Sequence, residues 1–168
     1  MTMPMPGRAA APASRIRAPR PRICDSGILS GTLLLTREGE MPVEFLAPGD
    51  HVITRDAGMI RIEAVSRMTR TLRAVFFTAG SLGHTRPESD LILPASQAVL
   101  VRDWRAPAMF GRAQAMVPAA ALIDGAFVKD LGQREMRLHQ LHFAKPHVVY
   151  AGGMELGCGD DLALQQAA

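Results

Sequence analysis

The chain has 168 residues, 48% of them hydrophobic, which suits one domain that can bury a core without disulfides or metals. Its net charge of +3 is unevenly spread, because the first 22 residues include arginines at positions 8, 15, 17, 20 and 22 and no acid. No stretch approaches the roughly 18 consecutive apolar residues of a membrane-spanning helix, which excludes that class of protein.

Residues 1–22 are rich in Pro, Ala and Arg and show no hydrophobic periodicity. Such a segment buries too little apolar surface to offset the entropy of ordering, so we predict a disordered, solvated tail. The tail lacks the apolar centre of a secretory signal peptide, which predicts a cytoplasmic protein, although export by a non-classical route stays open. Its arginines predict weak attraction to anions and no specific nucleic-acid binding.

From residue 27 onward, short runs of β-branched and aliphatic residues are bounded by turn residues, a pattern typical of strands. Turns are predicted at Gly39, Gly49 and Gly58, with a positive φ angle at Gly39. Residues 104–112 are expected to form a loop and residues 117–122 a single helical turn, with Pro118 at a first helical position. Strands are expected at residues 32–36, 41–45, 51–55, 59–68, 72–79, 91–93, 98–101, 134–143 and 147–150.

Two distant stretches share a faint pattern that suggests related halves of one sheet system. The matching positions are Val43, Leu46, Gly49-Asp50 and Val52 in the first stretch, and Val117, Leu122, Asp124-Gly125 and Val128 in the second. We therefore predict an all-β fold, one hairpin-rich domain of pseudo-two-fold character over residues 24–158, followed by a short tail at residues 159–168.

The string SGILSGTLLLTREGEMPVEFLAPGDHVITRDAG, residues 26–58, resembles the start of a Hint domain, the Hedgehog/intein fold, in its bacterial form. That family opens with a cysteine four residues before a Gly-Thr pair, which is Gly31-Thr32 here. Three later segments are similar to further family elements: DLILPASQAVLVRD at 90–103, AMVPAAALIDG at 115–125 and LHFAKPHVVYAGGMELG at 141–157. The resemblance implies the Hint fold over about residues 27–157.

The resemblance also implies autoprocessing, in which the first residue attacks the carbonyl carbon just upstream in an N-to-S or N-to-O acyl shift. That step needs a thiol or hydroxyl nucleophile, and a histidine suited to proton transfer near neutral pH. The matching positions hold Gly27, which has no side chain, and Gln97, which donates hydrogen bonds but does not shuttle a proton. We therefore expect a degenerate site without processing activity.

Ser26 and Cys24 are the candidate substitute nucleophiles. A shift of one residue along an extended segment reverses the side-chain direction, so Ser26 is expected to face away from the site unless the strand bulges. Cys24 would lie roughly 10 Å back along an extended chain. Cys24 and Cys158 are expected to be reduced thiols.

Other sequence features give no independent site. His139, His142 and His147 have the spacing H-x2-H-x4-H, but positions 139 and 142 point to opposite faces of a strand, so we predict no metal site. We also predict no cofactor, because the chain has neither a glycine-rich phosphate loop nor a G-x-S-x-G motif.

Three hypotheses of function follow. We favour a catalytically silent Hint fold that acts as a scaffold or interaction module for an unidentified protein partner. The alternatives are active self-cleavage through Ser26 or Cys24, and an unrelated β-barrel binding module. A degenerate site further predicts that strand pairing brings Gly27 and Gln97 together. A Cα separation above about 15 Å, well beyond the ~8 Å reach of cross-strand neighbours, would contradict it.

Overall fold

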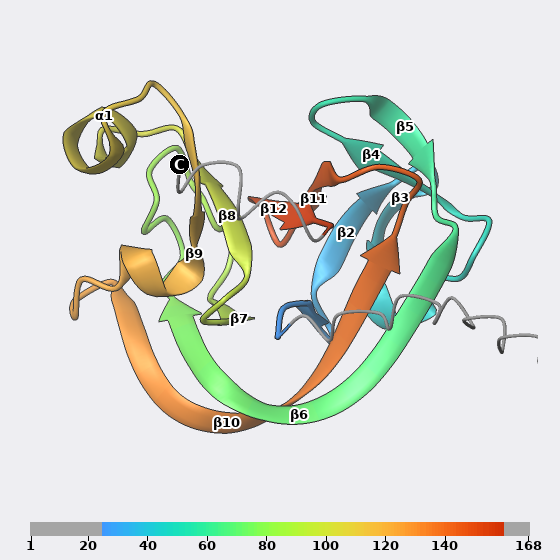
Figure 1. Cartoon of the computed structure of the whole chain (residues 1–168), viewed down its shortest axis with the longest axis horizontal. Helices are drawn as coiled ribbons and strands as arrows, with labels where there is room; N and C mark the ends of the chain where they lie inside the picture. The colour runs from blue at the N-terminus through green and yellow to red at the C-terminus, as the bar shows by residue number, and fades with distance from the viewer. Residues whose placement is uncertain (1–24, 160–168) are drawn as a thin grey trace, which may run out of the picture.

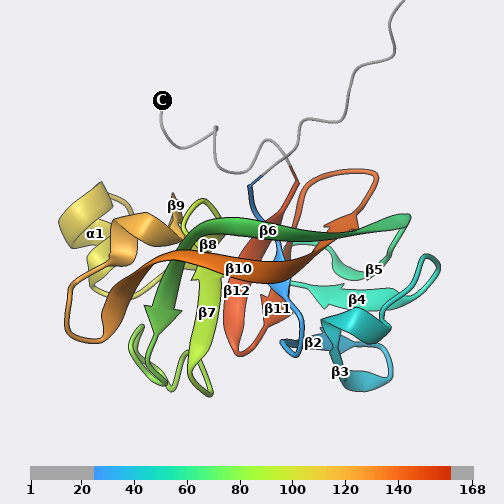
Figure 2. The ribbon, with the colours of Figure 1, turned by 90° about the horizontal axis from the view of Figure 1, so that it is seen from below.

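Two long antiparallel strands organise the fold: β6 (Ala64–Phe77) and β10 (Val128–His142). In the computed structural model, which describes residues 25–159, they pair along nearly their whole lengths with one bulge near Gly132. Figure 1 shows this pair bent into a U, and Figure 2 shows it from below as a two-stranded ribbon. The short β1 (Ile28–Leu29) pairs with β10 and β7 (Leu91–Pro94) pairs with β6, which completes a four-stranded sheet.

The remaining strands form an eight-stranded antiparallel sheet in the order β3-β2-β4-β11-β12-β8-β9, with β5 paired to β4. Its strands are β2 (Leu33–Thr36), β3 (Gly39–Pro42), β4 (His51–Thr54), β5 (Gly58–Arg61), β8 (Ala98–Val101), β9 (Ala115–Pro118), β11 (His147–Ala151) and β12 (Met154–Cys158). β12 thus lies in the middle of the sheet, between β11 and β8 (Figure 1).

A strand, a proline and a short 3-10 helix occur in the same order in each half of the chain. β3 ends at Pro42 and leads into η1 (Val43–Phe45), and β9 ends at Pro118 and leads into η2 (Ala119–Leu122). Both prolines have the extended conformation that suits the residue before a helical turn. The same spacing then leads to a buried leucine and valine in each half: Leu46 and Val52, Leu122 and Val128. The two halves therefore align on their prolines, rather than on Val43 and Val117.

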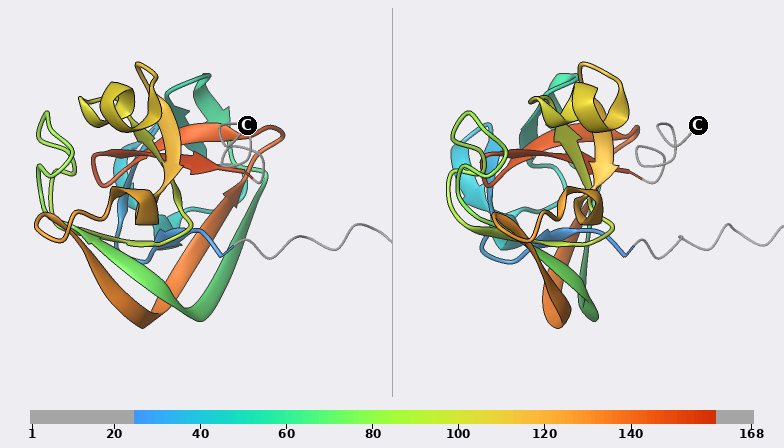
Figure 3. Two further views of the ribbon diagram at one scale, coloured as in Figure 1. Left: turned by 60° about the vertical axis from the view of Figure 1, so that its left-hand side comes forward. Right: turned by 90° about the vertical axis from the view of Figure 1, so that its left-hand side faces the viewer.

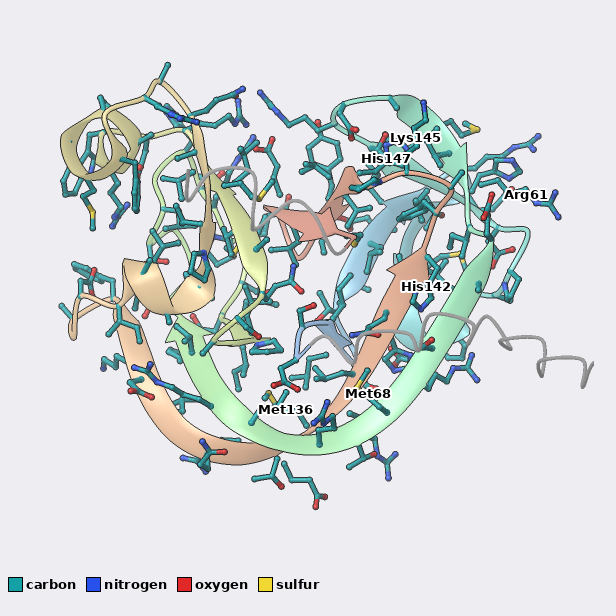
Figure 4. All side chains as sticks on the ribbon, in the orientation of Figure 1. Arg61, Met68, Met136, His142, Lys145 and His147 are labelled. Atoms are coloured by element: carbon teal, nitrogen blue, oxygen red, sulfur yellow. The ribbon has the colours of Figure 1, made fainter. Side chains whose placement is uncertain are left out.

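The main core is mostly aliphatic and draws on strands of both sheets, with Phe77 as its largest fully buried side chain. A second cluster contains Met136 and Leu138, and Met68 packs against it. Figure 4 shows Met68 and Met136 on the concave side of the bent ribbon. The helix α1 (Arg105–Phe110) and the bend of the ribbon lie at opposite ends of the molecule (Figure 3).

The strands expected at residues 59–68 and 72–79 are wrongly bounded. β5 ends at Arg61, and residues 64–77 form one continuous strand. The gap expected between the two predicted strands is absent, because β10 pairs with each polar residue around Arg70, and exposed side chains do not end a strand whose backbone is paired. The strand expected at residues 41–45 likewise ends early, because η1 follows Pro42.

The loop expected at residues 104–112 contains α1. Pro107 falls in the first turn of this helix, where backbone N–H groups have no partner within the helix. Gly111 ends the helix with a positive φ angle of 67°, a common glycine C-cap. The positive φ predicted for Gly39 is confirmed, and the other two turn glycines, Gly49 and Gly58, also have positive φ.

Within residues 25–159, no helix is long and apolar enough to cross a membrane. The predicted tail at residues 1–22, Cys24 and residues 160–168 lie outside the described part of the chain.

Candidate processing site

Gly27 and Gln97, 70 residues apart in sequence, are joined by a buried hydrogen bond. The Gly27 N–H donates to Oε1 of Gln97 at 3.0 Å, and the Gln97 side chain is almost completely buried. Gln97 occupies the turn between β7 and β8, while Gly27 comes directly before β1. The predicted proximity is therefore confirmed. The predicted cause is wrong, because β1 pairs with β10 and the two segments are linked by side chains of the β7–β8 turn, Gln97 to Gly27 and Ser96 to Asp25.

The orientation of the Gln97 amide follows from its other partners. Its Nε2 donates to the carbonyl oxygens of Ala98, at 3.0 Å, and Gly157, at 2.9 Å. Both amide protons are therefore used, and Oε1 is left to accept the Gly27 N–H. A glutamine held in this way has no ionisable proton to deliver to the nitrogen of Gly27.

Gln140 of β10 contacts the other side of the same peptide bond. Its Nε2 donates to the carbonyl oxygen of Ser26 at 2.8 Å. The bond between Ser26 and Gly27 thus has a donor at its carbonyl oxygen and an acceptor at its N–H group. A donor at the carbonyl oxygen is the arrangement that stabilises a tetrahedral intermediate in acyl transfer, but here no nucleophilic side chain belongs to residue 27.

The backbone around Gly27 fits glycine closely. Its φ angle is +151°, which residues with side chains rarely adopt. A Cβ atom at this position would lie 3.1 Å from Cβ of Leu138 and 3.3 Å from the carbonyl oxygen of His139. The site therefore lacks room for a nucleophilic side chain at position 27 without movement of β10.

Ser26 lies one residue too early for this set of contacts. A hydroxyl attack by Ser26 would break the bond after Asp25, whereas Gln97 and Gln140 bind the next peptide bond along. The carbonyl oxygen of Asp25 accepts a hydrogen bond from the Ser96 hydroxyl. Cys158, next to Gly157, is a free thiol whose pKa is raised to about 12 by burial, so it is protonated at neutral pH.

The three histidines of the H-x2-H-x4-H pattern have separate partners. His139 is buried, and its Nε2 lies 2.7 Å from Oγ of Ser30. His142 is exposed and bonds to Ser66, while Nδ1 of His147 lies 2.8 Å from Oδ2 of Asp56. Figure 4 shows His142 on β10 and His147 on β11. Within residues 25–159, no three His, Cys, Asp or Glu side chains converge in a way that could hold a metal ion.

Two titratable residues, Glu44 and His139, lie near the hydrogen bond between Gly27 and Gln97, which we call the Gly27–Gln97 junction. Oε2 of Glu44 accepts the N–H of Gly31 at 2.7 Å, which lowers the pKa of this carboxyl group. Burial lowers the pKa of His139, and the positive charge of Arg67 lowers it further, so His139 is mainly neutral at pH 7. This histidine contacts Ser30 and makes no hydrogen bond to the Ser26–Gly27 peptide among the contacts of residues 25–159.

Sequence reasoning missed Gln140, Ser96 and Gly157 as parts of the site. Ser96 and Gly157 lie in the segments 90–103 and 141–157 that resemble the family, but nothing there marks them as contacts of the site, and Gln140 lies outside these segments. The sequence placed Gln140 only as the residue after His139 on the strand expected at residues 134–143.

A family model described as the Hint domain matches residues 27–157. This chain belongs to the Hint domain family. The match begins at Gly27 and ends at Gly157, so the first and last matched residues of this Hint domain are both hydrogen bonded to the Gln97 side chain. The alternative of an unrelated β-barrel module is therefore wrong.

Solved structures share the fold of this Hint domain. The solution structure of a bacterial intein-like domain from Clostridium thermocellum is 14% identical, with a TM-score of 0.55 over 80% of this chain and 98% of that chain. A DnaB intein from Synechocystis sp. PCC 6803 is 10% identical, with a TM-score of 0.55 over 80% of this chain and 99% of the intein. At such low identity the likeness shows the fold alone. No curated protein matches the sequence of this Hint domain.

Proposed function

We propose that this Hint domain does not process itself and that it acts as a scaffold or interaction module for a protein partner. The hydrogen bond from Gly27 to Gln97 carries the proposal. At the position where processing chemistry needs a nucleophile, the chain has a glycine. At the position where it needs a proton donor, it has an amide oxygen that accepts.

The contacts of Gln97 support a structural role for the Gly27–Gln97 pair in place of a catalytic one. One buried side chain joins the start of the domain, the first residue of β8 and the end region of β12. Breaking one of these hydrogen bonds within the folded domain is costly, because the donor and the acceptor would stay buried without a partner and without water. An intact junction also keeps whatever precedes Ser26 covalently attached to the domain.

The proposal is tested by the intact mass of the full chain during long incubation, with and without dithiothreitol or hydroxylamine. These nucleophiles cleave thioesters and esters, so they would trap an acyl shift. We expect one unchanged mass under all conditions. A fragment ending at Asp25 would show that Ser26 is active, and a fragment ending at Ile23 would show that Cys24 is active. Either fragment would overturn the proposal if it disappears when its candidate nucleophile is replaced by alanine.

The matched controls are Ser26→Ala and Cys24→Ala, each of which removes one candidate nucleophile. A fragment that persists in both variants would indicate a contaminating protease and would leave the two acyl-shift routes excluded.

A further inference from the structure

Three arginines from separate segments converge on one buried carboxylate in the centre of the eight-stranded sheet. Glu155 of β12 is almost completely buried. Arg102 binds it with two hydrogen bonds of 2.8 Å, through Nε and Nη2. Nη1 of Arg55 and Nη1 of Arg86 each lie 3.1 Å from Oε1 of Glu155. The carboxylate therefore brings three guanidinium groups to one place.

The charges in this cluster do not cancel. One carboxylate faces three guanidiniums, which leaves two positive charges in excess, since arginine stays protonated in proteins. The Glu155 side chain is 1% exposed, whereas those of Arg55, Arg86 and Arg102 are 30%, 34% and 34% exposed. The Glu155 carboxylate is thus buried beneath the three guanidinium groups, and the excess positive charge lies on the solvent side of the cluster.

The arginines keep unused donors. Among the contacts of residues 25–159, Arg86 uses only Nη1 and Arg102 only Nε and Nη2. The backbone of Arg86 is fixed, because its N–H donates to Gly83 and its carbonyl accepts from Leu82. A held guanidinium with free N–H groups is ready to bind a planar anion at little entropic cost.

Arg86, Arg102 and Glu155 line one pocket of about 280 Å³. The apolar part of its wall is formed by Leu82, Leu100, Val101 and Met154. Asp103 also lines it, but the carboxylate of Asp103 is paired with Arg105 and does not neutralise the cluster. His84 completes the lining. A small pocket with an apolar wall and a convergent cationic end suits a ligand with an apolar body and one anionic head.

We infer that this pocket binds a small organic carboxylate, with its head on Arg86 and Arg102 and its apolar body against Leu100 and Met154. The site is separate from the Gly27–Gln97 junction, and its function does not depend on whether the domain processes itself. Carboxylate is the class favoured here because the apolar wall would add nothing to the binding of a compact inorganic anion.

The inference is tested by titrating the full chain with hexanoate while following the side-chain Nε–Hε resonances of its arginines by NMR. We expect a saturable shift of the Arg102 resonance. Acetate, which lacks the apolar chain, should bind at least tenfold more weakly. Arg86→Gln should weaken hexanoate binding about tenfold, the loss expected for one charge-assisted hydrogen bond.

Arg134→Gln is the matched control, because it removes the same charge from an exposed position of β10. It should leave hexanoate affinity within about twofold. If Arg86→Gln does not fold, Arg86→Lys replaces it as the test variant, because it keeps a positive charge beside Glu155. It should weaken hexanoate binding severalfold, because lysine lacks the planar guanidinium that binds a carboxylate through two N–H groups. The inference is overturned by an absence of saturable shifts, by equal binding of acetate, or by equal weakening in Arg134→Gln.

Discussion

Gly27 and Leu138 are packed so closely that a Cβ atom on Gly27 would lie 3.1 Å from Cβ of Leu138. The strand that carries Leu138 is β10, which also pairs with β1 directly after Gly27. A side chain at position 27 would therefore meet the same strand that holds the start of the domain in place.

Gly27→Ala should destabilise the domain by about 1–3 kcal/mol, because it adds both backbone strain and a close contact. Gly31→Ala is the matched control: its φ angle is also positive, at +89°, but a Cβ there would meet nothing within 4 Å. Chemical denaturation gives the loss of unfolding free energy in each variant. Gly31→Ala adds backbone strain alone, and Gly27→Ala adds backbone strain and a close contact with β10. Equal losses, or a smaller loss at Gly27, would show that β10 does not close the site.

Gln97→Met should cost about 2–4 kcal/mol of unfolding free energy. Methionine has a similar volume, but it leaves the Gly27 N–H and the carbonyls of Ala98 and Gly157 without their partner. Gln133→Met, at an exposed position of β10, should change stability by less than about 0.5 kcal/mol. Similar effects of the two substitutions would argue against a buried Gln97 network.

Introducing the two residue types that processing needs, a thiol at position 27 and a histidine at position 97, should not produce processing. The test protein combines Gly27→Cys with Gln97→His and carries a short N-terminal extension. Its new side chain at position 27 would meet Leu138 and the carbonyl oxygen of His139. We expect lower stability and no thiol-dependent cleavage on a gel or by mass spectrometry. Cleavage that requires both substitutions would mean that only the two side chains had been lost and that the surrounding site is still competent.

Acid should weaken the fold through His139. Burial, with a further effect of Arg67, lowers the pKa of His139 from 6.5, and Glu44 opposes this only in part. The unfolded state then binds more protons than the folded state below about pH 6.5, so stability falls as the pH falls towards the folded pKa. His139→Gln should flatten the fall in unfolding free energy between about pH 7.5 and 5.5.

His142→Gln provides the comparison for that experiment, since His142 is an exposed histidine on the same strand. It should leave the pH dependence close to that of the original chain. Equal flattening by both substitutions would contradict a specific contribution of buried His139.

The turn positions predicted from glycine residues were the most reliable of the sequence predictions. Gly39, Gly49 and Gly58 have the positive φ angles that their turns require. The family pattern also placed Gly27 near Gln97, since turn residues fix chain direction whatever residue types stand at these two positions. The continuity of β6 was not predictable in the same way, because its middle is polar and depends on pairing with β10, which is distant in sequence.

The partners of the junction were the least predictable part of the site. Whether Gln97 accepts from Gly27 depends on two carbonyl groups, those of Ala98 and Gly157, that occupy its amide protons. The role of Gln140 depends on the register in which β1 and β10 pair. Side-chain hydrogen bonds of this kind follow from tertiary geometry and leave no local pattern in the sequence.

Hydrogen exchange at the Gly27 amide tests most directly whether Gln97 holds this group as an inert structural bond. The amide should exchange slowly in the original chain, and at least about tenfold faster in Gln97→Met, which corresponds to a loss of about 1.4 kcal/mol. The Gly31 amide, which donates to Glu44 at an exposed position, should exchange at the same rate in both. A Gly27 amide that exchanges as fast as an unprotected one in the original chain would contradict the account.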